Sequence, residues 1–506
     1  MSSQFRLKFA GAYNTRVSAV NAADTSSGYV GVGIVGLMIV GKTSASSNKD
    51  QRFLNCFIQT TTDPTGKKRY YLVKRPGFGT YNTPASGSTG EQIIVWTGQG
   101  TGQKVITAFG ETTSTIYDGT TSLGAITGEC TGLTETTVGT NYATIVASSN
   151  DNTAWYYDAG STVAVMTKIT DVDFPGNQTP ARPLAGTFVH MDGYAVIMCT
   201  DGTIWASDLN SITSWNVLSF DSANAYPDQG IGLVRHKNMI MAFGTESVQF
   251  FYNAGFSPFP FAKSVAMTVK IGAINADSIT SISDSVFWCG STPQGGIGVF
   301  KYDSGIGKVS TPEIDAVLIL AGTSNITMTS MRTFGRSFVI INAAAQSFVY
   351  CIEENFWHEW NSTTPLWNKC AGTSIGSTMV NYALSHVSTS GKVYIQNHAS
   401  QVFTDDGTTY TARAQLAQED HGTTRRKFYN DIEVVGDTET STSDLTILYT
   451  DDDYQTWTTA GTVDLSGARP RLTRLGSSRN RAWCITHSAA TPMRIECLEG
   501  NLEVGQ

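Results

Sequence analysis

The stretch of this chain whose residue types most suggest chemistry is a glycine-rich segment, residues 29–43. It matches two phosphate-binding patterns, the dinucleotide fingerprint and the phosphate-binding loop of nucleotide triphosphatases, through Gly31, Gly33, Gly36, Gly41, Lys42 and Thr43. Such loops need small residues between the glycines and a helix that begins at the lysine. Here residues 37–40 are Leu, Met, Ile and Val, and the residues after Thr43 are polar. We therefore interpret the segment as a strand or loop buried against a neighbouring subunit or another part of the same assembly, and we expect no cofactor.

A second pattern, residues 450–457, resembles the Asp-box of sialidases. Its sequence is Thr-Asp-Asp-Asp-Tyr-Gln-Thr-Trp, with Tyr454 where glycine is usual. In those enzymes the box is a structural hairpin turn remote from catalysis, and glycosidases also need two carboxylates that face each other across a pocket. No such pair is indicated here. The pattern therefore predicts a hairpin in a carboxy-terminal β-domain, and we assign no catalytic residue.

The potential metal ligands of the chain are dispersed. Its seven histidines have no metal-ligand spacing, and its eight cysteines form no Cys-Xaa-Xaa-Cys pair. We expect no metal site, and reduced cysteines that pack as small core residues, as is usual in a cytoplasm. The amino terminus lacks the apolar core of a signal peptide, and the glycine-rich segment is too short to span a bilayer, so we expect no membrane segment.

Two surface-type clusters leave alternatives open. The densest positive charge lies near the carboxy terminus, with possible interface or DNA-proximal residues at Arg425, Arg426, Lys427, Arg471 and Arg474. These residues could contact DNA, form a solvated face, or make salt bridges across a subunit interface. Residues 356–360, Phe-Trp-His-Glu-Trp, could stack on a sugar, although such a cluster more often packs between sheets.

The elements that must position these residues are β-strands, arranged as a module that recurs from about residue 93 to 403. Apolar runs centre on Ile106, Ile145, Val196, Ile240, Phe287, Val339 and Tyr394, and partner strands centre on Ile116, Trp155, Ile204, Phe250, Phe300, Val349 and Val402. Within a module, alternate residues differ in polarity, as expected for strands. Both series step by about 40–55 residues, which is the size of a propeller blade.

Length and composition fit this reading. The chain has 506 residues, only 15% of them charged, and a net charge of −8, which argues against a protein that grips phosphates through a basic face. We predict an all-β protein with three parts: an extended amino-terminal region (1–90, with a glycine-rich insert at about 17–50), a propeller of about six or seven blades (91–410), and a β-rich domain (411–506).

Two passages share their pattern with one family. The first contains Tyr13, Arg16, Arg52, Asn55, Pro76 and Gly77, and the second contains Trp205, Asp208, Asn210, Trp215, Pro227, Asp228, Phe243 and Gly244. Both resemble the tail hub or nozzle proteins of short-tailed bacteriophages, also called packaged-DNA stabilisation proteins. The likeness covers most of the chain, except residues 17–50, where the glycine-rich segment interrupts it. The motif side chains have structural chemistry: Asp208 and Asn210 can cap a turn, and Pro227 fixes the backbone.

The resemblance implies a structural virion protein made in the host cytoplasm and built into the phage tail. It implies a ring of six copies that continues the channel of the portal and adaptor, retains packaged DNA, lets double-stranded DNA pass without sequence recognition, and contacts tail fibre, spike or needle proteins. An acidic lumen would repel the phosphate backbone. The alternative is a carbohydrate-binding or glycan-degrading propeller, suggested by Trp357, Trp360 and Trp367.

Overall fold

The structure is a computed structural model that describes residues 2–8, 29–32, 52–96, 104–138, 141–158, 165–292, 295–343, 346–362, 366–375, 378–386 and 390–505. These residues fall into two compact units. Unit 1 comprises Met1–Gly79, Gln346–Thr363 and Ser400–Gln506, and unit 2 comprises Thr80–Ala345 and Thr364–Ala399. The segments that precede and follow unit 2 in the sequence therefore belong to the same unit.

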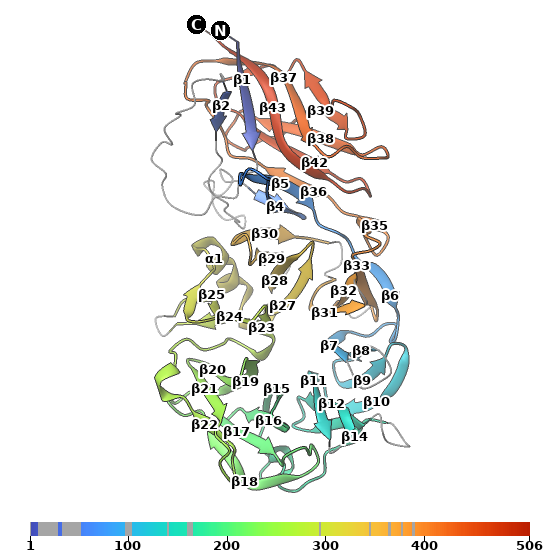
Figure 1. The fold of residues 1–506 in the computed structure, drawn as a ribbon, viewed down its shortest axis with the longest axis vertical. Coiled ribbons are helices and arrows are strands. Elements are labelled where there is room, and N and C mark those ends of the chain that lie inside the picture. The colour runs from blue at the N-terminus through green and yellow to red at the C-terminus, as the bar shows by residue number, and fades with distance from the viewer. Residues whose placement is uncertain are drawn as a thin grey trace. The chain divides into compact units, whose positions relative to one another are not determined.

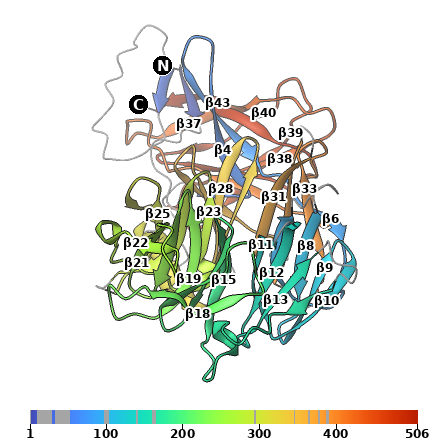
Figure 2. The same ribbon diagram turned by 60° about the horizontal axis from the view of Figure 1, so that its bottom comes forward.

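Unit 2 is built from successive antiparallel sheets (Figures 1 and 2). Its first two sheets, in order along the chain, are β7 (Gly90–Trp96), β8 (Lys104–Phe109), β9 (Thr113–Asp118) and β10 (Thr121–Thr127), then β11 (Cys130–Val138), β12 (Asn141–Ser149), β13 (Ala154–Asp158) and β14 (Thr167–Lys168). The third sheet consists of β15 (Leu184–Met191), β16 (Tyr194–Cys199), β17 (Thr203–Ser207) and β18 (Trp215–Ser222), and the fourth of β19 (Gly230–His236), β20 (Met239–Gly244), β21 (Val248–Asn253) and β22 (Phe261–Lys263). The fifth consists of β23 (Ile279–Ile282), β24 (Ser285–Ser291), β25 (Ile297–Tyr302) and β26 (Ile306–Lys308).

The sixth and seventh positions complete the series. The hairpin of β27 (Ile326–Thr333) and β28 (Arg336–Ala343) takes the sixth position, and β31 (Lys369–Ile375), β32 (Thr378–Leu384) and β33 (Val393–Asn397) form the seventh sheet with β6 (Gly79–Asn82). Helical segments within this unit are α1 (Pro312–Ala321), η2 (Pro175–Asn177), η3 (Val265–Met267), η4 (Ala276–Ser278) and η5 (Thr323–Asn325).

The sheets close into a ring. The first strands contact one another in the order β7, β11, β15, β19, β23, β27 and β31, and β31 contacts β7 again. Closure is completed by β6, which precedes the first sheet in the sequence but forms the outer strand of the seventh. Because a closed ring has no free inner edge, this arrangement is a seven-bladed β-propeller.

Position within a blade explains the burial of each strand. Second strands such as β16, β20 and β24 are buried along nearly their whole length, because neighbouring blades cover both of their faces. Outer strands such as β10 alternate between buried and exposed residues. The core is correspondingly split into clusters between adjacent blades, one of which packs Ile106 on β8 and Ile145 on β12 together with Trp96.

The recurring module predicted from the sequence corresponds to the second and third strands of a blade. Ile106 and Ile116, for example, lie on β8 and β9, and Phe287 and Phe300 lie on β24 and β25. The seventh module was placed wrongly by one strand: Tyr394 lies on β33, the third strand, and Val402 lies outside any strand. The reason is that the seventh blade takes its outer strand from β6 and so has no strand of its own after β33.

Unit 1 is a β-sandwich. One sheet contains β2 (Tyr29–Val32), β1 (Ser2–Lys8), β43 (Arg494–Val504), β37 (Lys427–Gly436) and β40 (Arg471–Thr473), joined by β5 (Lys68–Lys74), β4 (Cys56–Thr62) and β41 (Ser477–Ser478). The other contains β29 (Gln346–Cys351), β30 (Phe356–Trp360), β3 (Arg52–Leu54), β36 (Ala412–Gln415), β42 (Ala482–His487), β38 (Asp444–Thr450) and β39 (Thr458–Asp464), and β34 (Thr404–Asp405) pairs with β35 (Thr408–Thr409). Residues such as Ile432, Ile447 and Leu498 from the two sheets share one core.

Candidate functional site

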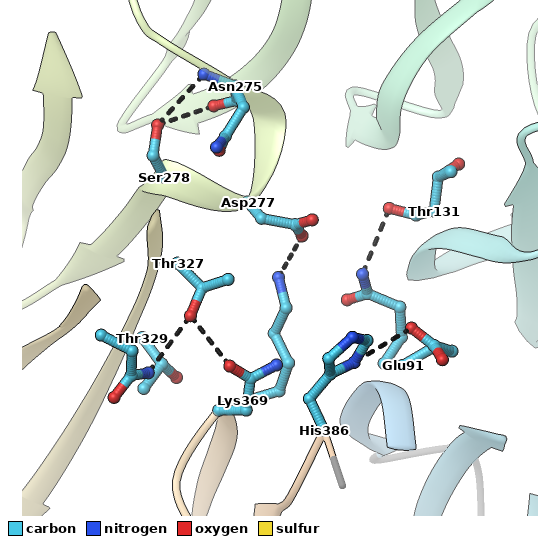
Figure 3. A network of polar contacts seen from close by, with 12 residues as sticks. Glu91, Thr131, Asn275, Asp277, Ser278, Thr327, Thr329, Lys369 and His386 are labelled. Atoms are coloured by element: carbon cyan, nitrogen blue, oxygen red, sulfur yellow. Dashed lines mark hydrogen bonds and ion pairs between the residues drawn. The ribbon is translucent and has the colours of Figure 1, made fainter. Parts of the chain in front are cut away.

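Polar side chains meet at one end of the propeller axis, where the first strands begin (Figure 3). They come from β7 (Glu91 and Gln92), β11 (Thr131), η4 (Asp277), β27 (Thr327 and Thr329), β31 (Lys369) and the residues after β32 (His386). Since the first strands contact one another in a ring, their starting residues are brought together although they are almost 300 positions apart along the chain. We call this set the axial network.

The axial network is crossed by an ion pair. The Lys369 ammonium donates to Asp277 Oδ1, which joins the fifth blade to the seventh. Burial is the largest influence on Asp277 and works against its ionisation, but the charge of Lys369 and the hydrogen bonds from Lys369 and from Gln92 of the first blade together outweigh it and lower the pKa of this carboxyl. The side chain of Asp277 thus contacts blades that are not its neighbours in the ring, and it crosses the axis.

Hydroxyl and amide groups extend the axial network between adjacent blades. Thr327 Oγ1 donates to Asn368 Oδ1 at 2.9 Å, and the amide of Cys370 donates to Thr329 Oγ1 at 2.8 Å. Gln92 Nε2 donates to the carbonyl oxygen of Thr131 at 3.3 Å. These contacts tie the sixth blade to the seventh and the first blade to the second.

Glu91 is the most deeply buried acid of the axial network. Its side chain is 5% exposed, and its Oε2 lies 3.7 Å from His386 Nδ1. Desolvation raises the pKa of Glu91 to about 8, and the nearby carboxylates of Glu129, Glu111 and Asp277, together with a side-chain hydrogen bond to Glu129, add to the rise. At neutral pH this carboxyl therefore holds a proton.

Further along the axis, short hydroxyl side chains link neighbouring first strands. Thr134 on β11 and Thr187 on β15 lie 2.9 Å apart, and Thr280 Oγ1 on β23 donates to Ser330 Oγ on β27 at 3.2 Å. Because Asp277 and Lys369, from blades that are not neighbours, meet at the axis, one propeller leaves no passage there for a duplex, whose major groove alone is about 12 Å wide. The axial network can store a proton and fasten blades together. Among the described residues, no group of three His, Cys, Asp or Glu is placed to hold a metal ion.

The first family passage surrounds a buried arginine that the sequence analysis did not single out. Arg75 is fully buried, and its guanidinium donates to both carboxylate oxygens of Asp405, at 3.0 and 2.5 Å, and to Asn55 Oδ1 at 2.9 Å. The ring of Tyr410 lies 3.9 Å from the guanidinium carbon. We call Arg75, Asn55, Asp405 and Tyr410 the arginine cluster.

The other residues of this passage lie in the same unit. Arg52 makes two hydrogen bonds to Glu359, and Arg75 also donates to the carbonyl of Pro76. A Cβ atom on Gly77 would come within 2.1 Å of the carbonyl oxygen of Thr404, so only glycine fits there. Tyr13 and Arg16 lie outside the described residues. Its position next to the family residues Pro76 and Gly77 could have drawn attention to Arg75, but its partner Asp405 is 330 residues away.

The second family passage packs the third and fourth blades. Trp205 is buried and stacks on Phe220, and Phe243 packs edge-on against Trp288. Trp215 donates from its ring nitrogen to the carbonyl of Ile212.

The polar residues of the second passage shape turns. Asp208 Oδ2 accepts from Ser214, and Asn210 adopts a positive φ of 55°. Asp228 Oδ2 accepts from the amide of Glu246 and the hydroxyl of Ser247. A Cβ on Gly244 would lie 2.2 Å from that same oxygen, so glycine lets the carboxylate approach. Pro227 is exposed in the segment that leads to β19.

The carboxy-terminal basic residues have different environments. Arg425, Arg426 and Arg474 are exposed, whereas Lys427 is fully buried and donates to two main-chain carbonyls, and the exposed Arg471 pairs with Asp431. Lys427 is therefore not part of the exposed surface.

The structure also locates the other residues noted in the sequence. Residues 450–457 form the predicted hairpin turn between β38 and β39, in which Asp452 accepts hydrogen bonds from Thr450 and Thr456. Trp357, Trp360 and Trp367 are buried, so they offer no stacking surface for a sugar. All eight cysteines lie in the described residues and are free thiols, seven of them buried. Of the glycine-rich segment, Tyr29–Val32 forms β2, which pairs with β1, and Lys42 lies outside the described residues.

Known proteins resemble this chain over most of its length. A family model described as Bacteriophage P22 Gp10, beta-propeller, matches residues 41–431. The chain belongs to this family. It is accordingly a structural protein of a bacteriophage particle, and its propeller is the fold of the family. Among solved structures, BamB from Moraxella catarrhalis is similar, at 12% identity and a TM-score of 0.38, over 71% of this chain and 97% of that one. No curated protein matches.

No helix in the described part of the chain has the length and apolar character needed to span a bilayer.

Proposed function

We propose that this protein is the subunit of a ring-shaped hub or nozzle in a short phage tail. Six copies surround a channel that continues from the portal and adaptor, retains the packaged DNA, and lets it pass during ejection. The observation that carries the proposal is the family match over 41–431, together with the ion pair between Asp277 and Lys369 that spans the propeller axis. Since the axis of one propeller is closed to a duplex, the DNA passage must lie between copies.

The charge of the chain supports a conduit. Its net charge is −8, and Lys427 and Arg471 of the carboxy-terminal basic set are occupied by contacts within unit 1. A channel wall without a continuous basic surface does not bind the phosphate backbone tightly, so DNA can slide through it. We place the exposed Arg425, Arg426 and Arg474 at contacts between copies or beside the channel, and the protein in the virion tail after synthesis in the host cytoplasm.

The proposal is tested by two measurements on the full chain. Negative-stain microscopy with native mass spectrometry should find rings of six copies with an axial hole, alone or on purified portal and adaptor. Particles assembled without this protein should fill with DNA and then lose it, measured as DNase-accessible DNA. A protein that stays monomeric even with portal and adaptor present, in particles that retain DNA without it, would refute the proposal. Binding to host glycans by the monomer would favour the carbohydrate-binding alternative instead.

A further inference from the structure

Exposed apolar side chains gather at one end of the third and fourth blades, where the first strands of these blades end. Five of them have exposed fractions of 47–76%: Val172, Leu209, Val217, Leu218 and Phe256. The amide of Trp215 at the start of β18 donates to Asp171 Oδ2 at 2.9 Å, which holds the segment of Val172 beside this strand. Single exposed apolar residues are common, but a group of them marks an interaction surface.

The turn between β15 and β16 joins the loops that carry these side chains. The amide of Asn210, which follows Leu209, donates to the carbonyl of Gly193 at 2.8 Å. On the fourth blade, Asn253 Nδ2 donates to Asp192 Oδ2 of the same turn at 2.9 Å, at the start of the loop that contains Phe256. We call this apolar group, with the turn and loops that carry it, the blade-end surface.

The blade-end surface has a net negative charge. Four carboxylates lie on its segments: Asp171, Asp173, Asp192 and Asp208. The hydrogen bonds that Asp171, Asp192 and Asp208 accept come from neutral groups, and no lysine or arginine of the described residues forms an ion pair with the four. Two cations lie on or beside the neighbouring turn between β19 and β20. Arg235 donates to main-chain carbonyls, and Lys237 is 3.9 Å from a further acid, Asp303.

The outer face of β37 in unit 1 has the opposite charge. Phe428 is 47% exposed on this strand, whose first residues alternate between buried and exposed. It pairs with Ser477 on β41, and the amide of Arg474 donates to the carbonyl of Asn430, two residues beyond Phe428, at 2.9 Å. Four exposed arginines therefore lie near this ring: Arg425, Arg426, Arg474 and Arg479. They outnumber the neighbouring acid, Glu503, which lies opposite Phe428 on β43. We call Phe428 and the four arginines the basic face.

We propose that the basic face of one copy binds the blade-end surface of the next copy in the ring. The inference rests on the proposed function and names the two surfaces that join its copies. Phe428 packs among the apolar side chains of the neighbour, and the arginines lie against its carboxylates. The two surfaces are different, so each copy uses one toward each neighbour, and a head-to-tail contact of this kind can close into a ring.

A second copy of the chain is the occupant that the charges favour. The two surfaces are complementary, because each combines exposed apolar groups with an excess of charge that is opposite in sign to the other's. Burial of the apolar groups supplies affinity, and the opposite charges fix the orientation of the contact. DNA could pair with the arginines, but it would leave Phe428 exposed and would be repelled by the blade-end surface.

Two charge-reversed forms of the full chain test the contact. The first carries Arg425→Glu and Arg426→Glu in the basic face, and the second carries Asp173→Lys and Asp192→Lys in the blade-end surface. Lysine fits the backbone at position 192, where φ is 52°, because Lys237 has a φ of 54° at the equivalent position of the next blade. Circular dichroism and urea midpoints check that both forms are folded.

The measurement is native mass spectrometry with one form labelled with ¹⁵N, under the conditions in which the wild-type chain forms rings, alone or on purified portal and adaptor. Each form by itself brings like charges together at every contact, so its ring fraction should fall by at least about tenfold. An equimolar mixture should restore the rings, with the two forms alternating, because every contact then joins opposite charges. A control form with Glu246→Lys and Asp444→Lys, exposed acids outside both surfaces, should form rings like the wild type.

The apolar part of the contact is tested separately. Phe428→Ser and Leu218→Ser should each raise the protein concentration at which half of the chains are in rings by about tenfold. Leu320→Ser is the matched control, because Leu320 is 73% exposed on α1 and belongs to neither surface, so its rings should form as in the wild type.

The outcomes separate this inference from the proposed function. If wild-type rings form but the mixture is no better than its two components, the inference is wrong and the proposed function stands. Normal rings of the first form with a loss of DNA binding would place the arginines at DNA, and normal rings of the second form would leave the blade-end surface to another tail protein; either result overturns the inference. A wild-type chain that forms no ring even with portal and adaptor would refute both.

Discussion

Removal of the Asp405 carboxylate tests the arginine cluster. Arg75 is fully buried and Asp405 is 3% exposed, so Asp405→Ala removes the carboxylate that accepts two hydrogen bonds from the buried guanidinium and balances its charge. Breaking a buried pair in this way typically lowers the free energy of unfolding by about 3–5 kcal/mol. We expect a loss of that size for unit 1. Asp405→Asn keeps the shape and one acceptor, and it should give an intermediate loss of about 1.5–3 kcal/mol.

Urea unfolding of the full chain, followed by circular dichroism and tryptophan fluorescence, measures these losses. Asp444→Ala is the matched control, because Asp444 is exposed on β38 of the same unit and should change stability by less than about 0.5 kcal/mol. If Asp405→Ala lowered the unfolding free energy by less than about 1 kcal/mol, or if Asp405→Asn matched the wild type, the guanidinium would not depend on this carboxylate.

Three other outcomes are expected. His358 is fully buried against Phe53 and Phe356, and desolvation lowers its pKa to about 3. The unfolded state therefore takes up the proton first, so this group lowers stability by about 1.4 kcal/mol per pH unit as the pH falls from about 6.5 to about 3. Burial also lowers the pKa values of His421 and His487, so His358→Phe should reduce the slope of a pH series of urea midpoints without removing it, and an unchanged slope would contradict the assignment. Gly77→Ala should lower the unfolding free energy by about 1–3 kcal/mol through overlap with Thr404, whereas Gly307→Ala, which meets open space, should change it by less than about 0.5 kcal/mol in the same assay. On the proposed ring, the double variant Arg425→Glu and Arg426→Glu should reduce the hexamer fraction in native mass spectrometry. The exposed pair Lys67→Glu and Lys68→Glu is the control and should leave that fraction unchanged. If both double variants reduced it equally, the arginines would not lie at contacts between copies.

The propeller could be predicted from the sequence because its signal is local and repeated. Second strands are covered on both faces, so β16 and β24 read as continuous apolar runs at a regular interval. The closure of the ring could not be predicted in the same way. The strand β6 has only four residues and none of them is buried, so the sequence carries no alternation that would mark it as a strand, and its partner β33 lies more than 300 positions away. The boundaries expected near residues 90 and 410 remain predictions about domains.

The axial network was missed for a related reason. Glu91, Asp277 and Lys369 have ordinary sequence surroundings, and only the ring places them together. The one local sign was a carboxylate at the start of an apolar strand, Gly90 to Trp96, which is an unusual place for a charge. The glycine-rich segment matches known sequence motifs, whereas Glu91, Asp277 and Lys369 of the axial network belong to no recognisable motif.

The arginine cluster joins the two segments of unit 1 that, in the sequence, directly precede and follow the propeller. Arg75 precedes β6, Asp405 follows β33, and these two strands pair to close the seventh blade. Two main-chain hydrogen bonds next to Arg75 and Asp405 also join the two segments. The amide of Gly77 donates to the carbonyl of Val402 at 2.7 Å, and the amide of Asp406 donates to the carbonyl of Phe78 at 2.8 Å. Holding both ends of the chain reduces the entropy lost when β6 and β33 pair. Asp405→Ala should therefore speed hydrogen exchange at the amides of β6 and β33 more than at those of β20, a second strand of the fourth blade. Uniform acceleration across the propeller would mean that the cluster stabilises unit 1 without securing the closure.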